Sequence, residues 1–149
     1  MTIYEQLRFG DHIESAHQAL QKISEEHSSG TFREGGWSRK EILGHLIDSA
    51  LNNHQRFVRA TLDGSYEGPG YAQVDWVNVH GYASMPWESI LEHWAFQNRL
   101  LAEVVRRIPE ARLEVSCRVG TDSPVTLRFL VEDYLAHMDH HLRQILSTS

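Results

Sequence analysis

Apolar residues recur every three or four positions along most of the chain, a spacing that places them on one face of an α-helix. The pattern predicts four long helices, at about residues 3–27, 38–62, 86–108 and 126–146. The second helix opens with Ser38-Arg-Lys-Glu41, a capping box in which the serine and glutamate side chains each accept a backbone N–H. Gly10 weakens the first helix, because glycine in a helix interior is destabilising.

Two connections between these helices lack a helical period. The first, from Asp63 to Met85, is long and aromatic, and connections of this length are usually functional or contain a short element. We expect a short helix over Gln73–Val79, with the aromatic side chains either walling a pocket or packing as a satellite hydrophobic cluster. The second alternates apolar and polar residues over Arg112–Val119, which predicts a short strand or hairpin before the last helix.

Four long helices with these connections predict an all-α four-helix bundle, and 149 residues predict a single domain over residues 1–149. The formal net charge of −6 argues against a nucleic-acid partner, which would need a basic face. The sequence has no run of eighteen apolar residues and no signal-like apolar segment, so we expect a cytoplasmic protein without a membrane partner. Cys117 is the only cysteine and is expected to be structural.

Three histidines occupy the edges of the apolar faces of two predicted helices. His137 and His141 are four residues apart on the last helix and so point the same way, and His45 has the same kind of position on the second. A pair spaced in this way is more often buried and hydrogen-bonded than metal-ligating, but a third histidine changes that balance. Three imidazoles would leave a zinc-like ion with an open position, the arrangement of catalytic sites.

Polar neighbours support a metal site. The candidates to accept a ring N–H each lie about one turn from one of these histidines: Asp48, Asp133 and Gln144. The alternatives are that the two aspartates form ion pairs with surface cations and that Gln144 is solvated. Arg56 lies on the His45 side of its helix and is a candidate anchor for a substrate carboxylate, with a surface ion pair as the alternative. The other pocket candidates are aromatic: Tyr71, Trp76 and Tyr82.

Two motifs together, in this order and at this distance, resemble the DinB/YfiT-like superfamily: Trp37-Ser-x-x-Glu-Ile-Leu-Gly-His45-Leu-Ile-Asp48-Ser and Glu132-Asp-Tyr-x-x-His137-x-x-x-His141-Leu-x-Gln144-Ile. The resemblance extends over nearly the whole chain. It implies a four-helix bundle, often a homodimer, in which His45, His137 and His141 hold one divalent ion, variously zinc, nickel, iron or manganese. Characterised members of that superfamily include S-transferases that join thiols such as bacillithiol to electrophiles, and mycothiol-dependent maleylpyruvate isomerase.

The resemblance and the histidines together favour a metal-dependent transferase that joins a low-molecular-weight thiol to a small electrophile. One alternative is a metal-dependent hydrolase acting through a water of lowered pKa, for which Asp48 and Glu132 are the available general bases. A second alternative is a non-catalytic binding protein whose metal only stabilises the helix bundle, with His80 or His93 as a fourth ligand. The sequence names neither the metal nor the thiol and electrophile.

Overall fold

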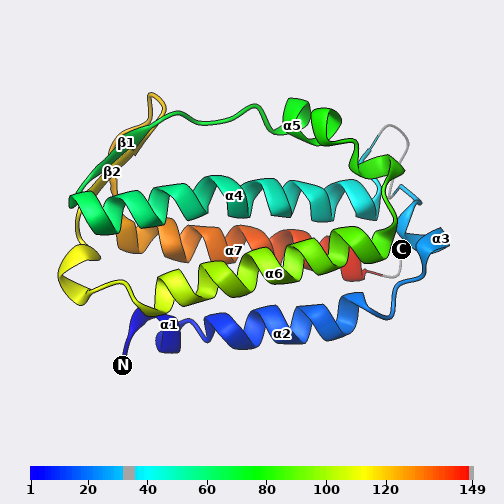
Figure 1. Ribbon diagram of the computed structural model, residues 1–149, viewed down its shortest axis with the longest axis horizontal. Coiled ribbons are helices and arrows are strands. Elements are labelled where there is room, and N and C mark those ends of the chain that lie inside the picture. Colours follow the sequence, from blue (N-terminus) through cyan, green and yellow to red (C-terminus); the bar gives the residue numbers. More distant parts are fainter. Residues whose placement is uncertain (32–35, 148–149) are drawn as a thin grey trace.

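Four long helices lie side by side in the computed structural model, which describes residues 1–31 and 36–147 (Figure 1). They are α2 (Phe9–Leu20), α4 (Arg39–Asp63), α6 (Trp87–Arg106) and α7 (Leu127–Leu146). The helices α4 and α6 run in one direction, and α2 and α7 run in the other (Figure 1). Each of α4 and α2 packs against both α6 and α7. The predicted four-helix bundle is therefore confirmed, with two of its consecutive long helices parallel.

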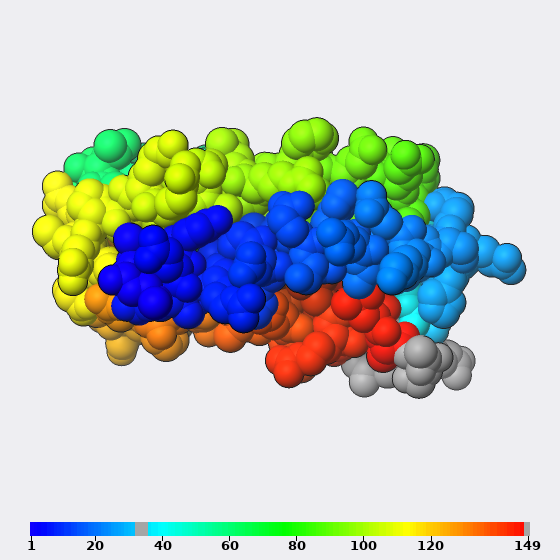
Figure 2. Space-filling view, turned by 90° about the horizontal axis from the view of Figure 1, so that it is seen from below, coloured from blue at the N-terminus to red at the C-terminus, as the bar shows by residue number. Residues whose placement is uncertain are grey.

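The first predicted helix is wrong as a continuous element, because the chain divides it into α1 (Ile3–Gln6), α2 and α3 (Glu25–Ser28). The first break falls at Arg8, whose φ of 51° is left-handed and cannot continue a helix. The break is not at Gly10, which lies inside α2, where a Cβ would overlap the hydroxyl of Tyr4. The view in Figure 2 shows α1 and α2 (dark to mid blue) lying over α6 and α7.

Helix α4 is the central helix of the bundle. Its predicted capping box is present: Glu41 N–H donates to Ser38 Oγ at 3.3 Å, and Ser38 N–H donates to the Glu41 carboxylate at 3.1 Å. The helix ends at Gly64, whose φ of 75° suits a residue without a Cβ. Its first half is buried on nearly every side, including the charged residue Arg39, which donates to the carbonyl oxygens of Ile145 and Ser147 at 2.9 Å.

A small sheet closes one end of the bundle. Its strands are β1 (Tyr66–Gly68), β2 (Ser116–Val119) and β3 (Val125–Thr126), in the order β1-β2-β3. The β2–β3 pair is the antiparallel hairpin that the sequence predicts, preceded by a short 3₁₀ turn, η2 (Glu110–Arg112). Strand β1, which pairs with β2 in parallel, is too short to leave a sequence pattern.

Between β1 and α6 the chain returns along the full length of α4 (Figure 1). This return, residues 69–86, contains the predicted short helix, α5 (Gln73–His80), and a 3₁₀ turn, η1 (Tyr82–Ser84). We call it the α5 segment. It packs along α4, which also packs against α6 and α7.

The core between the four helices is apolar and aromatic. Tyr134 of α7 lies between Phe9 and Phe57, with ring centroids 6.1 Å from each, and its hydroxyl donates to Asn98 of α6. Burial raises the pKa of Tyr134 well above its usual range. Within the described ranges, no helix is both long enough and apolar enough to cross a membrane.

Candidate metal centre

The antiparallel packing of α4 on α7 brings the three predicted histidines together. The Nε2 atoms of His45 and His137 are 3.2 Å apart, and the ring centroids of the three pairs lie 4.6–5.1 Å apart. One nitrogen from each of His45, His137 and His141 lies within 4.8 Å of the others. Ligands about 2.0–2.1 Å from one tetrahedral ion are roughly 3.3 Å from each other, so these nitrogens are close to the spacing that one ion requires.

The environment of this triad favours the neutral imidazole, which is the form that binds metals. His45 is 1% exposed, and burial, with smaller contributions from His137 and His141, lowers its pKa to about 4. Burial also lowers the pKa of His137 and of His141, which are half-buried. Three neutral, converging nitrogen donors therefore fit a divalent transition metal.

One polar neighbour holds a ring of the triad, as the sequence suggests. His141 Nδ1 lies 2.8 Å from Gln144 Oε1, and because that oxygen can only accept, the proton of the ring is on Nδ1 and Nε2 is left as the donor to a metal. Asp133 acts more weakly: its charge raises the pKa of His137 against the effect of burial, but no hydrogen bond joins the two in the described part of the chain.

The expectation that Asp48 accepts a ring N–H of His45 is wrong. The Nδ1 atom of His45 is buried without a hydrogen-bond partner among residues 1–31 and 36–147. Asp48, which is completely buried, accepts instead from the hydroxyl of Tyr82 at 2.7 Å and contacts Nδ1 of His80 at 2.9 Å. The α5 segment covers this part of α4, and its side chains contact Oδ1 of the carboxylate, while Oδ2 has no hydrogen-bond partner among the described residues.

Burial is the main influence on the pKa of Asp48 and raises it. The hydrogen bond from Tyr82 and the charge and hydrogen bond of His80 act in the opposite direction. Tyr82 itself is held by close packing: a Cβ at position 44 would overlap its ring, so Gly44 is required there. His80 and His93 lie outside the converging histidine group, so neither completes it as a fourth ligand.

The structure brings the four predicted pocket residues to the side of α4 that the α5 segment covers. Trp76 meets Tyr71 edge to face, with centroids 5.3 Å apart, and burial raises the pKa of Tyr71. Arg56 is 8% exposed, and its hydrogen bonds within the described part of the chain are long ones, to the carbonyl of Pro69 at 3.4 Å and to Asn53 Oδ1 at 3.5 Å. No carboxylate in the described ranges pairs with Arg56, which excludes the predicted alternative of a surface ion pair there.

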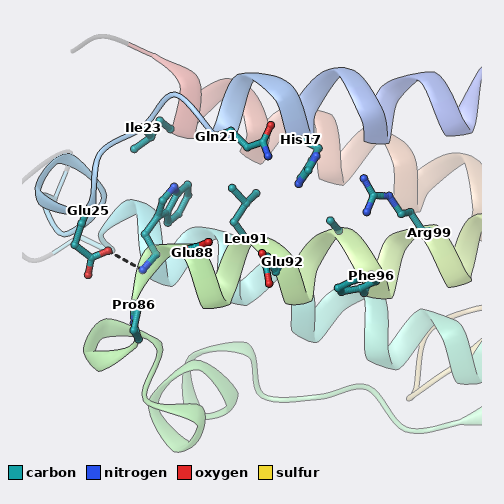
Figure 3. A pocket seen from close by; sticks show the side chains of 12 residues that line it. His17, Gln21, Ile23, Glu25, Pro86, Glu88, Leu91, Glu92, Phe96 and Arg99 are labelled. Atoms are coloured by element: carbon teal, nitrogen blue, oxygen red, sulfur yellow. Dashed lines mark hydrogen bonds between the residues drawn. The ribbon is translucent and has the colours of Figure 1, made fainter.

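A separate groove lies on the other side of the molecule, between α2 and α6, with a volume of about 780 Å³ (Figure 3). Its sides carry His17 from α2, Gln21 just after α2, and Glu92, Phe96 and Arg99 from α6. It is lined by none of the triad histidines and none of the aromatic pocket candidates, although Pro86 at the end of the α5 segment borders it. It is therefore distinct from the metal centre.

We expect Gln144→Ala to weaken metal binding by about 10–100-fold, the usual effect of losing a side chain that orients a ligating histidine. Competition with a chromophoric chelator measures this affinity. Gln97→Ala is the matched control, because Gln97 contacts the ring of His54, which lies outside the triad. Equal affinities for the two variants would contradict a role for the 2.8 Å contact to His141.

Comparisons with known proteins agree with this geometry. A family model described as the DinB superfamily matches residues 8–145. A protein of Oceanobacillus iheyensis named "Putative metal-dependent hydrolase OB0413" is 26% identical over 128 residues, which cover 86% of this chain and 73% of that protein. A Geobacillus thermodenitrificans protein that is also named a "Putative metal-dependent hydrolase" is 24% identical over 133 residues, which cover 87% of this chain and 73% of that protein.

Two solved structures share the fold. YfiT from Bacillus subtilis, described as a probable metal-dependent hydrolase with an unusual four-helix bundle topology, superposes with a TM-score of 0.80 at 18% identity, over 95% of this chain and 82% of that one. A mycothiol-dependent maleylpyruvate isomerase superposes with a TM-score of 0.72 at 13% identity, over 95% of this chain and 60% of that one. At these identities the likeness establishes the bundle and its topology.

Proposed function

This chain belongs to the DinB superfamily, and from that premise we propose that it is a metal-dependent enzyme acting on small molecules. The observation that carries the proposal is the convergence of one nitrogen each from His45, His137 and His141 between α4 and α7. These three side chains would hold one divalent ion. Zinc, nickel, iron and manganese are the candidates, because imidazole suits several of these metals.

Bound there, a divalent ion would supply Lewis acidity at an open position and favour the deprotonated form of a water or thiol. The chain supplies the remaining functions from α4 and the α5 segment. Arg56 has unused N–H donors and no acidic partner among the described residues, so it is suited to bind a carboxylate or another anionic group of the substrate. Tyr71 and Trp76 offer aromatic surface to the apolar part of that substrate and exclude water from it.

Hydrolysis of a small ester or amide is the reaction that we favour. The similar proteins named above carry the name of metal-dependent hydrolases, which supports this reaction for a chain whose three histidines could hold a metal. Thiol transfer to a small electrophile is the second candidate, supported by the fold shared with a mycothiol-dependent isomerase. The two reactions differ in whether a thiol must be added, and this difference makes them separable.

We expect purified protein loaded with zinc, nickel, manganese or iron(II) to hydrolyse members of a panel of small esters and amides without added thiol. Activity should disappear after chelation and return when the metal is restored. Parallel assays add a low-molecular-weight thiol and an alkylating electrophile, and conjugation that appears only with thiol would favour transfer. The absence of metal-dependent turnover in both assays, in protein shown to contain one ion per chain, would contradict the enzyme proposal.

A further inference from the structure

We propose that His80 is the proton-transfer residue of this site and that Asp48 is the residue that positions it. The inference rests on the proposed hydrolase function and extends it, because neither general base considered from the sequence is suitable. Asp48 is completely buried: its Oδ1 is occupied by two partners, and its Oδ2, which has no partner among the described residues, is closed to solvent. Glu132 is exposed on α7, and its position five residues before His137 turns it to a different face of that helix.

The Asp48 carboxylate determines which nitrogen of His80 carries the proton. Asp48 Oδ1 accepts from the Tyr82 hydroxyl at 2.7 Å and lies 2.9 Å from His80 Nδ1. The Oδ2 atom has no hydrogen-bond partner among residues 1–31 and 36–147, so the donors on Oδ1 are the ones that stabilise this buried carboxylate. It therefore favours the tautomer of His80 with a proton on Nδ1. The other ring nitrogen, Nε2, is then a proton acceptor.

The orientation of the His80 ring is also fixed. Trp76 and Tyr82 meet it edge to face, with centroid distances of 5.9 and 5.2 Å. The side chain remains 37% exposed, so the ring is reachable while its carboxylate partner is sealed from solvent. A buried acid, an oriented imidazole and an accessible second nitrogen are the parts of a carboxylate–histidine pair that accepts and returns a proton.

The pair is placed on the part of α4 that carries the metal centre. Asp48 follows His45 by three residues, a rise of about 4.5 Å along the helix. The ring of Tyr82, which bonds to Asp48, packs on Gly44, the residue next to His45. The α5 segment therefore delivers His80 to the same turn of α4 that delivers the first histidine of the triad.

In ester hydrolysis a proton passes from water to His80 and from His80 to the leaving alcohol. His80 Nε2 takes a proton from a water molecule as the water oxygen forms a bond to the ester carbonyl carbon. The imidazolium formed is stabilised by the Asp48 carboxylate beside Nδ1. As the bond from that carbon to the alcohol oxygen breaks, Nε2 returns the proton to the leaving oxygen. The products are the carboxylic acid and the alcohol, and His80 is neutral again.

Thiol transfer would depend less on this residue, because a thiol ionises near pH 8.5 whereas bulk water has a pKa of about 15.7. The variants His80→Gln and Asp48→Asn test the proposal. Asparagine has nearly the shape of aspartate, but its amide can donate to Nδ1 and so favours the opposite tautomer of His80. His93→Gln is the matched control, since His93 is exposed on α6 and lies outside the triad.

The first readout needs no activity. Nitrogen-15 NMR of the histidine rings in zinc-loaded protein should show His80 protonated on Nδ1 in the wild type and on Nε2 in Asp48→Asn. Metal content should be unchanged in all three variants. A wild-type His80 protonated on Nε2 would overturn the positioning role, and loss of metal from His80→Gln would make His80 a ligand instead.

The second readout is the ester assay. We expect His80→Gln to lower kcat by about 10²–10⁴-fold, the usual contribution of a general base, with little change in KM. His93→Gln should retain the wild-type rate. An unchanged kcat in His80→Gln would overturn proton transfer by this residue. A wild type that holds metal but hydrolyses nothing would refute the proposed hydrolase and the proton-transfer step with it, while the tautomer measurement would still decide whether Asp48 positions His80.

Discussion

Replacing His45, His137 or His141 by alanine is expected to lower the affinity for a divalent metal by at least about a hundred-fold, because even the loss of a residue that only orients a ligand costs 10–100-fold. Wild-type protein purified without a nickel column should carry close to one ion per chain, and each variant should carry almost none. Elemental analysis of the purified proteins measures this directly. The effect should be similar for all three, since one nitrogen of each contributes to the same cluster.

The matched control is His54→Ala, because His54 is also half-buried on α4 but lies outside the triad. Thermal unfolding supplies a second measure: a ligand present at a hundred times its Kd stabilises the native state by about 2.7 kcal/mol. A chelator should therefore lower the Tm of wild type and of His54→Ala, and leave the triad variants unchanged. A metal-free wild type that cannot be loaded would show that the three histidines are core residues.

The substitution Gly44→Ala is expected to destabilise the protein by about 1–3 kcal/mol, although alanine normally favours a helix. The added Cβ would overlap Cγ and Cδ2 of Tyr82, atoms at the root of a side chain whose hydroxyl is held by Asp48. The ring cannot withdraw without giving up that hydrogen bond or displacing the α5 segment. Thermal or denaturant unfolding measures the change, with an expected fall in Tm of about 2–4 °C for each kcal/mol.

A double-mutant cycle makes this prediction sharper. In a Tyr82→Ala background the overlap is absent, so Gly44→Ala should become stabilising by up to about 1 kcal/mol, the ordinary helix preference for alanine. Gly70→Ala is the control, because no atom lies within 4 Å of a Cβ there. A destabilisation by Gly44→Ala of the same size in both backgrounds would contradict the packing of Tyr82 on this glycine.

The parts of the molecule that the sequence predicts well are those with local signals. The spacing of apolar residues identifies α4, α6 and α7, and the capping box locates the start of α4. His45, His137 and His141 are predictable because each lies at the edge of an apolar helix face, and Gln144 because it is one turn from His141 on the same helix. These relations depend only on the geometry of a single helix.

The remainder depends on contacts between distant segments. Periodicity continues through Arg8, so nothing in the pattern marks the left-handed residue that divides the first helix. The partners of Asp48 come from more than thirty residues away, in a segment whose short helix has little amphipathic character. A carboxylate one turn from His45 suggests a bond within the helix, but the contacts of Asp48 are made by its Oδ1 with Tyr82 and His80.

The parallel course of α4 and α6 has a consequence for anyone who would transplant this site. A designed bundle whose helices alternate in direction can be joined by short hairpin loops, and it could carry the same three imidazoles on two facing helices. Such a copy would have no chain returning along α4, so its equivalent of Asp48 would face solvent and its equivalent of Arg56 would lose its cover. A minimal bundle without the α5 segment could therefore bind a metal, but it would lack the pocket that this segment forms along α4.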